Sequence, residues 1–439
     1  MTCAPKQNSI HKMEVKMKKA WLFLLLLLLS SFLFSQERTI RLEELTKLAL
    51  ERNPKIKAVA KEVEAYAFRI PQEKSLPDPM VGFSFKNIGF NKLTIGQDPM
   101  SGIGLSFSQT LPFPGKLRLK GEIAEKEYER KSVALHSVEL NVIKEVKVAY
   151  FELFSLQKSI EILMRQKTLL EKALNLTETK YAVGNGVQSD ILKAQVEISK
   201  IEEMIIPMNE MIKSLNAQIN LLLDFPPDKP LGIPEDMEIY GLEISLQELQ
   251  KLSAENSPLV KETDLMIEEN SKMIEMSKKE YYPDFKVEGG WDFKGHLGDM
   301  YEVMVGVEIP LYYKTKQAKR LAESQALMES SKNKLTTMKN DISLIIIENY
   351  IKANTSENLI KLYREKIIPQ ASLTIESSLA NYQVNKIDFL ALLTDINTLF
   401  SYEMAYYKEL SQLWSSIAQI EEFSATEIVN WGGKNEEKN

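Results

Sequence analysis

The side chains with the clearest chemical potential in this sequence are tyrosines and carboxylates in two stretches that align at an offset of 201 residues. KYAVGNGVQSDILKAQ carries Tyr181 and Asp190, and YQVNKIDFLALL carries Tyr382 and Asp388. Carboxylates that converge on an axis attract cations and repel one another, which is the chemistry of an ion pathway. An aspartate at a helix start is also a common cap, so Ser189 or Asp190 in the first stretch and Asp388 in the second are predicted helix caps. For Asp388 the two interpretations stay open.

Residue combinations that support catalysis do not occur in the sequence. Apart from the first 35 residues, the histidines are His136, on a long helical stretch, and His296, in a predicted turn. There is no paired-histidine metal motif, GxSxG nucleophile motif, phosphate-binding loop or EF-hand loop. Acidic residues on the helical stretches recur at salt-bridging intervals, which is typical of a solvated face. We therefore predict that the protein is not an enzyme and uses no cofactor or bound metal.

The first 35 residues have the pattern of a secretory signal, a lysine-rich start followed by WLFLLLLLLSSFLF. The alternative is a membrane anchor, but the run of 14 residues is shorter than the roughly 20 that a spanning helix needs. Cleavage after Ser35 would remove Cys3, the only cysteine, with five lysines and one glutamate, and change the formal charge from −6 to −10. An acidic exported chain is not predicted to bind nucleic acid.

An internal duplication organises the rest of the chain. IRLEELTKLALERNPKIK (40–57) and ISLQELQKLSAENSPLVK (244–261) share nine identities in 18 positions at an offset of 204. Each copy leads into a Pro-Asp pair, two strand-like runs and a long helical stretch. The predicted units are a signal peptide (1–35), a first repeat (36–235), a second repeat (236–425) and a polar tail (426–439).

Each repeat is predicted to contain a very long helical hairpin. In the first repeat, apolar residues recur at spacings of three and four, which is typical of a seam that packs against other helices. A helix over residues 116–181 would be about 100 Å long at 1.5 Å per residue. In the second repeat, residues 311–430 contain no glycine. Pro207 and Pro369 are predicted to mark points where the helices break.

The two hairpins are predicted to turn at tips, at about residues 181–190 and 382–390. A residue in the left-handed conformation ends a helix at low cost, and Gly184 or Gly186 supplies it in the first tip. In the second tip Asn385, which also tolerates this conformation, stands at the position of Gly184. Both stretches are therefore predicted to join two long antiparallel helices.

Each repeat is also predicted to form a β-hairpin, at about residues 80–111 and 285–311. Apolar and polar residues alternate over roughly ten residues per strand, as in a transmembrane β-barrel. A soluble hairpin pair with one face on a core alternates in the same way, but aromatic residues near the strand ends favour the membrane. The predicted lipid face comprises Phe83, Phe85, Leu105, Phe107, Trp291, Phe293, Val303, Val305 and Val307. The predicted lumen face comprises Lys286, Glu288, Asp292, Glu302 and Glu308.

Four strands per chain cannot close a barrel, because bacterial barrels have at least eight. A dimer would supply eight strands and a lumen filled by side chains, whereas a trimer would supply twelve and a possible channel. The charged inner face favours a water-filled lumen and hence the trimer. The predicted fold class is therefore mainly α with a transmembrane β-barrel that closes only in an oligomer.

The order of these features resembles the TolC-like outer-membrane efflux protein family over about residues 38–425. The more specific markers are the tip YAVGNGVQSDILKAQ, its echo YQVNKIDFLALLTDINTLF and the strand-to-helix transition SQTLPFPGKLRLKGEIAEKE. The tripeptide DPM, which occurs twice, and the PFPGK segment are most similar to the branch that serves heavy-metal efflux pumps.

The resemblance implies a homotrimer with a twelve-stranded barrel in the outer membrane and an α-helical tunnel in the periplasm. It implies a passive exit duct of a tripartite efflux system, served by an inner-membrane pump of the resistance-nodulation-division or ABC type. A periplasmic adaptor would dock near the hairpin tips. It also implies a gate at the tips held by Asp and Tyr side chains, at the positions of Tyr181, Asp190 and Tyr382.

The second repeat departs from the family at the positions of its lumen aspartates, where Ala391 and Thr394 stand here. Asp388 and Asp395 lie nearby but in a different helical phase, and three copies of Asp388 are the alternative carboxylate ring. Two other functions stay open from the sequence, the exit duct of type I protein secretion and a periplasmic coiled-coil scaffold that never enters a membrane.

Overall fold

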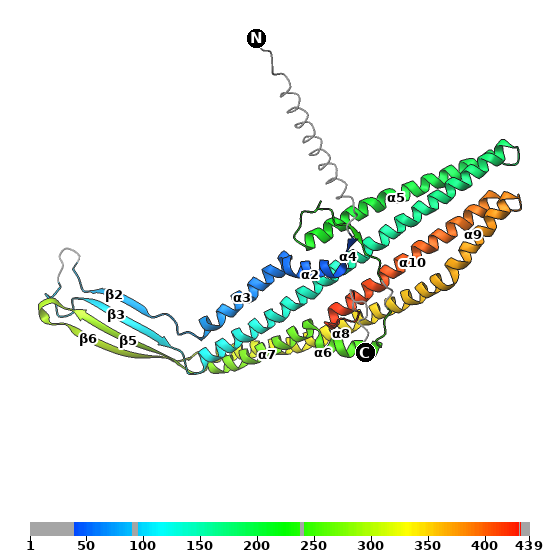
Figure 1. The fold of residues 1–439 in the computed structure, drawn as a ribbon. Helices are drawn as coiled ribbons and strands as arrows, with labels where there is room; N and C mark the ends of the chain where they lie inside the picture. Colours follow the sequence, from blue (N-terminus) through cyan, green and yellow to red (C-terminus); the bar gives the residue numbers. More distant parts are fainter. Residues whose placement is uncertain (1–38, 90–94, 238–240, 430, 432–439) are drawn as a thin grey trace, which may run out of the picture.

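The computed structural model describes residues 39–89, 95–237, 241–429 and 431. The predicted signal peptide and residues 432–439 of the predicted polar tail lie outside the described residues. The protomer is elongated, with a four-stranded sheet at one end, two helical hairpin tips at the other and a helical body between them (Figure 1). Among the described residues, none of the helices combines the length and the hydrophobicity of a membrane-spanning segment.

The two halves of the chain repeat one order of elements, two short helices, a β-hairpin and a long helical hairpin. The first half contains α2 (Leu42–Arg52), α3 (Pro54–Lys74), β2 (Met80–Lys86), β3 (Gly102–Leu111), α4 (Lys116–Ala182) and α5 (Gln188–Leu222). The second contains α6 (Leu246–Asn256), α7 (Pro258–Lys279), β5 (Asp284–Phe293), β6 (Met300–Glu308), α8 (Gln317–Leu362), α9 (Ile368–Gln383) and α10 (Phe389–Ser424). A short pair of parallel strands, β1 (Thr39–Ile40) and β4 (Ile233–Pro234), joins the start of the described chain to the segment after α5.

Helix α4 is the long rod that the sequence predicts, and it ends one residue beyond the predicted boundary. Its 67 residues span about 100 Å at 1.5 Å per residue. The left-handed Gly115 precedes it, and Val183 follows it at the tip. Buried residues recur along it at spacings of three and four, because α4 packs against α3 and α7 near the sheet and against α5 and α10 nearer the tips.

The predicted helix break at Pro207 is wrong, because α5 runs through this residue without interruption. Pro207 and Glu203, whose carbonyl loses its helical partner, are both exposed, so water can hydrate the carbonyl. At Pro369 the chain stays helical, because this residue lies in the first turn of α9; the irregularity precedes it. A π-helical turn (η2, Tyr363–Ile367) separates α8 from α9, and the Ile368 N–H donates to the carbonyl of Tyr363, five residues back.

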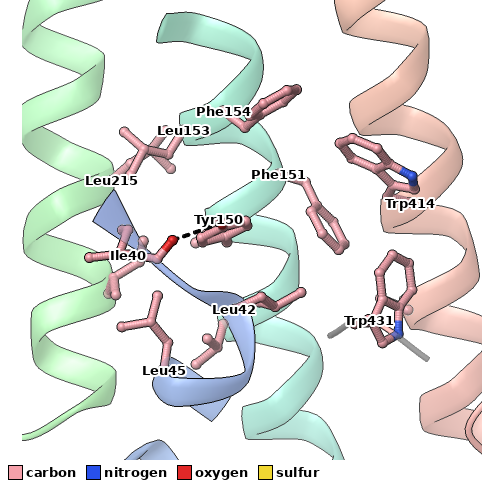
Figure 2. Packing of buried hydrophobic residues seen from close by; sticks show 14 of the residues in the cluster. Ile40, Leu42, Leu45, Tyr150, Phe151, Leu153, Phe154, Leu215, Trp414 and Trp431 are labelled. Atoms are coloured by element: carbon pink, nitrogen blue, oxygen red, sulfur yellow. Dashed lines mark hydrogen bonds between the residues drawn. The ribbon is translucent and has the colours of Figure 1, made fainter. Parts of the chain in front are cut away.

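The largest hydrophobic core lies in the middle of the helical body (Figure 2). Tyr150 is fully buried; its hydroxyl donates to the carbonyl of Ile40 and accepts from the backbone N–H of Glu235, both at 3.0 Å. On the other side of α4, the ring of Phe151 packs between Trp414 of α10 and Trp431, with centroids 5.4 and 5.1 Å away. The core therefore ties the start of the described chain and its end to the centre of α4.

A buried ion pair fixes the segment after α10. The ammonium of Lys147 lies 2.7 Å from a carboxylate oxygen of Glu421, and both residues are less than 9% exposed. Glu421 also accepts hydrogen bonds from the backbone N–H groups of Ile428 and Val429 and from the indole of Trp431. Burial of a charge is costly unless it is paired and hydrogen-bonded, and here one carboxylate satisfies four groups.

Replacing Glu421 by alanine is therefore expected to destabilise the protein by about 3–5 kcal/mol, because Lys147 is left buried without its partner. Denaturant unfolding followed by tryptophan fluorescence measures this, since Trp414 and Trp431 lie in the same core. The control is Glu210→Ala, which breaks the exposed 2.7 Å pair with Lys213 and should cost less than about 1 kcal/mol. Equal midpoints for the two variants would contradict a stabilising role for the buried pair.

Candidate gate and channel wall

Both hairpin tips turn through a single left-handed residue at equivalent positions. Gly184 has φ 78° and Asn385 has φ 59°, so the prediction for Asn385 is confirmed and Gly184 is the glycine that supplies the conformation. Gly186 has another role, because a Cβ there would lie 2.9 Å from the backbone nitrogen of Tyr181. The first glycine therefore permits the turn and the second permits the chain to pack closely behind it.

The caps of the returning helices differ between the tips. Asp388 is the N-cap of α10, and its carboxylate accepts from the N–H of Ala391 at 2.8 Å, as predicted. The predicted cap at Ser189 or Asp190 is wrong, because Val187 occupies the N-cap position of α5. At the offset of 201, Val187 is the equivalent of Asp388, so Ser189 and Asp190 fall inside the first turn. Asp190 there pairs with Lys193 at 3.5 Å. Its negative charge also interacts favourably with the positive end of the helix dipole.

Lys180, at the end of α4, joins the two tips. Its side chain is 8% exposed, and its ammonium donates to the carbonyl of Tyr382 and to the side-chain oxygen of Asn385. The same ammonium lies 4.1 Å from the centroid of the Tyr382 ring, within range of a cation–π interaction. One buried cation of the first hairpin thus holds the backbone, side chain and ring of the second.

Sequence reasoning missed Lys180, although the helix seam contains the signal. The buried residues of α4 continue to the tip at spacings of three and four, and Lys180 is the last of them. A lysine in the phase of a buried seam predicts a buried ammonium, and such a group requires oxygen partners. The buried residues of this last part of the seam are Leu163, Gln166, Leu170, Ala173, Thr177 and Lys180.

The predicted gate residues are only partly brought together. Tyr382 is 5% exposed, and its burial and the nearby charge of Asp190 raise its pKa to about 12, so the phenol stays neutral at physiological pH. Tyr181 is 49% exposed and stands apart from this group. Asp395 is occupied within its own hairpin, because it accepts from the hydroxyl of Ser378 at 2.5 Å. The contacts at the tips thus centre on Lys180 and Tyr382.

The four strands form one antiparallel sheet in the order β2-β3-β5-β6, and its register confirms the predicted separation of faces. Val81, Phe107 and Gly289 are paired in one row, and Phe83, Leu105, Trp291 and Tyr301 in another. The intervening rows carry the polar residues; one contains Gly82, Ser106, Gly290 and Glu302. All nine residues of the predicted lipid face therefore share one face, and the five residues of the predicted lumen face share the other.

The apolar face of the sheet is not covered within the protomer. Phe83 is 75% exposed and Val303 80%, so this face does not lie on a core as a soluble hairpin pair would require. The polar face is partly neutralised by ion pairs of Lys86 with Asp292 (2.7 Å) and of Lys286 with Glu288 (3.0 Å). Glu302 and Glu308 form no ion pair with the described residues, which leaves this face negative.

Small residues on the polar face of the sheet allow its side chains to pack closely together. A Cβ at Gly82 would lie 2.8 Å from the hydroxyl of Ser106, whereas the opposite face carries aromatic and branched side chains. A curved sheet with an exposed apolar outside, continued end-on by long helices, is the architecture of an outer-membrane channel protomer (Figure 1).

Comparisons with known proteins agree with this class. The sequence profile "Outer membrane efflux protein" matches residues 45–219. The cobalt-zinc-cadmium resistance protein CzcC of Cupriavidus metallidurans is 20% identical over 389 residues, which cover 87% of this chain and 89% of CzcC. The toluene efflux pump outer membrane protein TtgF of Pseudomonas putida is 25% identical over 239 residues, 48% of this chain and 49% of TtgF.

Solved structures show the same fold at low sequence identity. CusC superposes with a TM-score of 0.74 at 14% identity, covering 89% of this chain and 95% of CusC. VceC of Vibrio cholerae gives 0.74 at 17% identity, with 87% and 95% covered. Residues 45–219 thus match the outer membrane efflux protein family, and the fold of the described chain is that of outer-membrane channels such as CusC and VceC.

Removing the ammonium of Lys180 is expected to loosen the contact between the tips. Because Cys3 is the only cysteine of the chain, Val183→Cys and Val384→Cys introduce specific spin-label sites on the two exposed tips. The distance distribution between the labels should broaden in Lys180→Met. It should stay unchanged in Lys193→Met, because the ion pair of Lys193 lies within one hairpin. Identical distributions for wild type and Lys180→Met would show that this contact does not hold the tips together.

Proposed function

We propose that three copies of this chain close into a twelve-stranded barrel and a helical tunnel that together form the exit duct of a tripartite efflux system. The observation that carries the proposal is the sheet, in which an exposed apolar face, a polar face and two edge strands occur together. Exposed edges and an exposed apolar face are unstable in water, and closure with further copies inside a bilayer satisfies both. Three protomers satisfy the minimum strand number with a lumen wide enough to conduct.

In this arrangement the predicted lipid face contacts acyl chains and the predicted lumen face lines the water-filled pore. The protein conducts passively, and an inner-membrane pump of the resistance-nodulation-division or ABC type supplies the energy. A periplasmic adaptor docks on the hairpin tips. Exposed apolar residues at both tips support a docking surface there, since Val183, Val187 and Val384 are each more than half exposed.

The contacts at the tips are proposed to hold the tunnel entrance narrow. Lys180 links the hairpins within one protomer, and Asp190, Tyr181 and Tyr382 line the entrance around it. Asp388 serves as a helix cap, which occupies one of its oxygens. Opening then requires the second hairpin to move away from the ammonium of Lys180. Because water reaches the ammonium as its partners leave, the charge is not left buried and unpaired, and the electrostatic cost of opening is small.

The proposed duct is tested by single-channel conductance in a planar bilayer, with the mass of the purified protein in mild detergent. A trimer with small openings is expected, and Asp190→Ala, Tyr382→Leu, which removes the ring over Lys180, and Lys180→Met should each widen them. The matched controls Glu178→Gln and Lys172→Met alter exposed charges of the same hairpin without known partners among the described residues, and should conduct as wild type. A water-soluble protein without conductance would refute the barrel and support the periplasmic scaffold.

The proposed cargo is heavy-metal ions. The similarity to the cobalt-zinc-cadmium resistance protein spans most of both chains, whereas the similarity to the toluene pump protein spans about half. Disruption of the gene in its host is expected to lower tolerance to cobalt, zinc and cadmium several-fold in growth assays, with tolerance to toluene unchanged. The reverse pattern would assign the duct to organic solvents and leave its channel architecture standing.

A further inference from the structure

Positive charge is concentrated where the sheet joins the helical body. Four connections join the sheet to the helices there, and we call three of them, residues 111–120, 276–283 and 309–320, the junction collar; the fourth, residues 75–79, carries Asp78. Together the three collar segments contain nine lysines and arginines and one acidic residue, Glu280, whereas the whole chain has 55 basic and 61 acidic residues. A local charge of this sign in an acidic protein indicates an anionic partner.

Part of this charge is neutralised within the protomer, and part is available. Lys116 pairs with Asp284 at 2.7 Å and Arg320 with Glu280 at 2.6 Å. Arg118 pairs with Glu122 at 3.6 Å. The exposed lysines of the collar that form no ion pair with any described residue are Lys120, Lys278, Lys314, Lys316 and Lys319.

Exposed aromatic and apolar side chains accompany the lysines. Tyr312 is 79% exposed and Leu311 75%, and both directly precede the lysines at the start of α8. On the neighbouring segments, the rings of Phe113 and Tyr282 stack at 4.5 Å, and the ammonium of Lys279 lies 5.4 and 5.5 Å from their centroids. Tyrosines beside lysines are the combination that marks the boundary between hydrocarbon and water in membrane proteins.

The position of the collar relative to the apolar sheet face identifies this boundary. The last paired row of that face contains Leu111, Phe285 and Val307. The collar begins at Leu111 itself and two residues beyond Phe285 and Val307, after the paired Asp284 and Glu308. If the apolar face spans the hydrocarbon, the collar lies at the depth of the phospholipid headgroups on the periplasmic side. Each lysine near an anionic surface contributes about 1 kcal/mol of attraction.

We propose that the junction collar binds the anionic headgroups of phospholipids in the periplasm-facing leaflet of the outer membrane. The ammonium groups pair with headgroup phosphates, the tyrosine hydroxyls donate to phosphate or ester oxygens, and the tyrosine rings lie along the upper acyl chains. The inference rests on the proposed function, because it requires the sheet to be inserted in the bilayer. It adds a lipid requirement at a place that the conducting path does not use.

The test measures lipid retained by the full-length mature protein by native mass spectrometry. Wild type in mild detergent is equilibrated with equal amounts of phosphatidylglycerol and phosphatidylcholine, and the ratio of the two retained lipids is recorded. The collar variant is Lys314→Gln/Lys316→Gln/Lys319→Gln. The control Lys332→Gln/Lys334→Gln/Lys339→Gln removes the same charge from exposed positions further along α8.

We expect the collar variant to lose its preference for phosphatidylglycerol by at least about fivefold, the effect of one lysine at such a surface, with the control at the wild-type ratio. An unchanged ratio in the collar variant, or an equal fall in both variants, would overturn the collar as a lipid site while leaving the channel intact. A wild-type protein that is soluble without detergent and retains neither lipid would instead refute the proposed function itself.

Discussion

Burial of α4 along its whole length is the constraint on which the rest of the protomer depends. A helix of 67 residues gains most of its stability from neighbouring helices that cover its apolar seam. In this protein α3 and α7 cover it near the sheet, α2 and the paired segments β1 and β4 at the centre, and α5 and α10 towards the tips. The spacing of apolar residues on one helix thus dictates where both hairpins and both short helices lie.

Helix α4 also provides lysines that contact the second repeat near both of its ends and at its middle. At the sheet, Lys116 in its first turn pairs with Asp284 at the start of β5, which fixes the two hairpins of the sheet to one another. At the tip, Lys180 in its last turn binds the second helical hairpin. Between them, Lys147 binds Glu421 and holds the segment after α10. Three lysines of one helix therefore connect the first repeat to the second at both ends and at the middle.

Local features were predictable from the sequence, and contacts between distant segments were not. The length of α4, the left-handed tip at Asn385 and the two faces of the sheet follow from periodicity and residue type alone. The cap at the first tip was mispredicted because residue type favoured Ser189 or Asp190, whereas the position equivalent to Asp388 is held by Val187. The seam of α4 predicts that Lys180 is buried, but not which oxygens it binds, because Asn385 lies 205 residues away. Glu421 likewise depends on Lys147, 274 residues away, and on the backbone of a segment that folds back after α10.

The π-helical turn at residues 363–367 gives the two hairpins unequal stiffness. The first hairpin consists of α4 and α5, which are continuous over their lengths, and Pro207 removes one backbone hydrogen bond from α5 without changing its helical register. In the second hairpin the backbone ladder changes from i→i+4 to i→i+5 bonds just before Pro369, a residue that cannot donate to it. We therefore expect the second hairpin to bend at this level, so that α9 and the tip at Asn385 move together relative to the first hairpin.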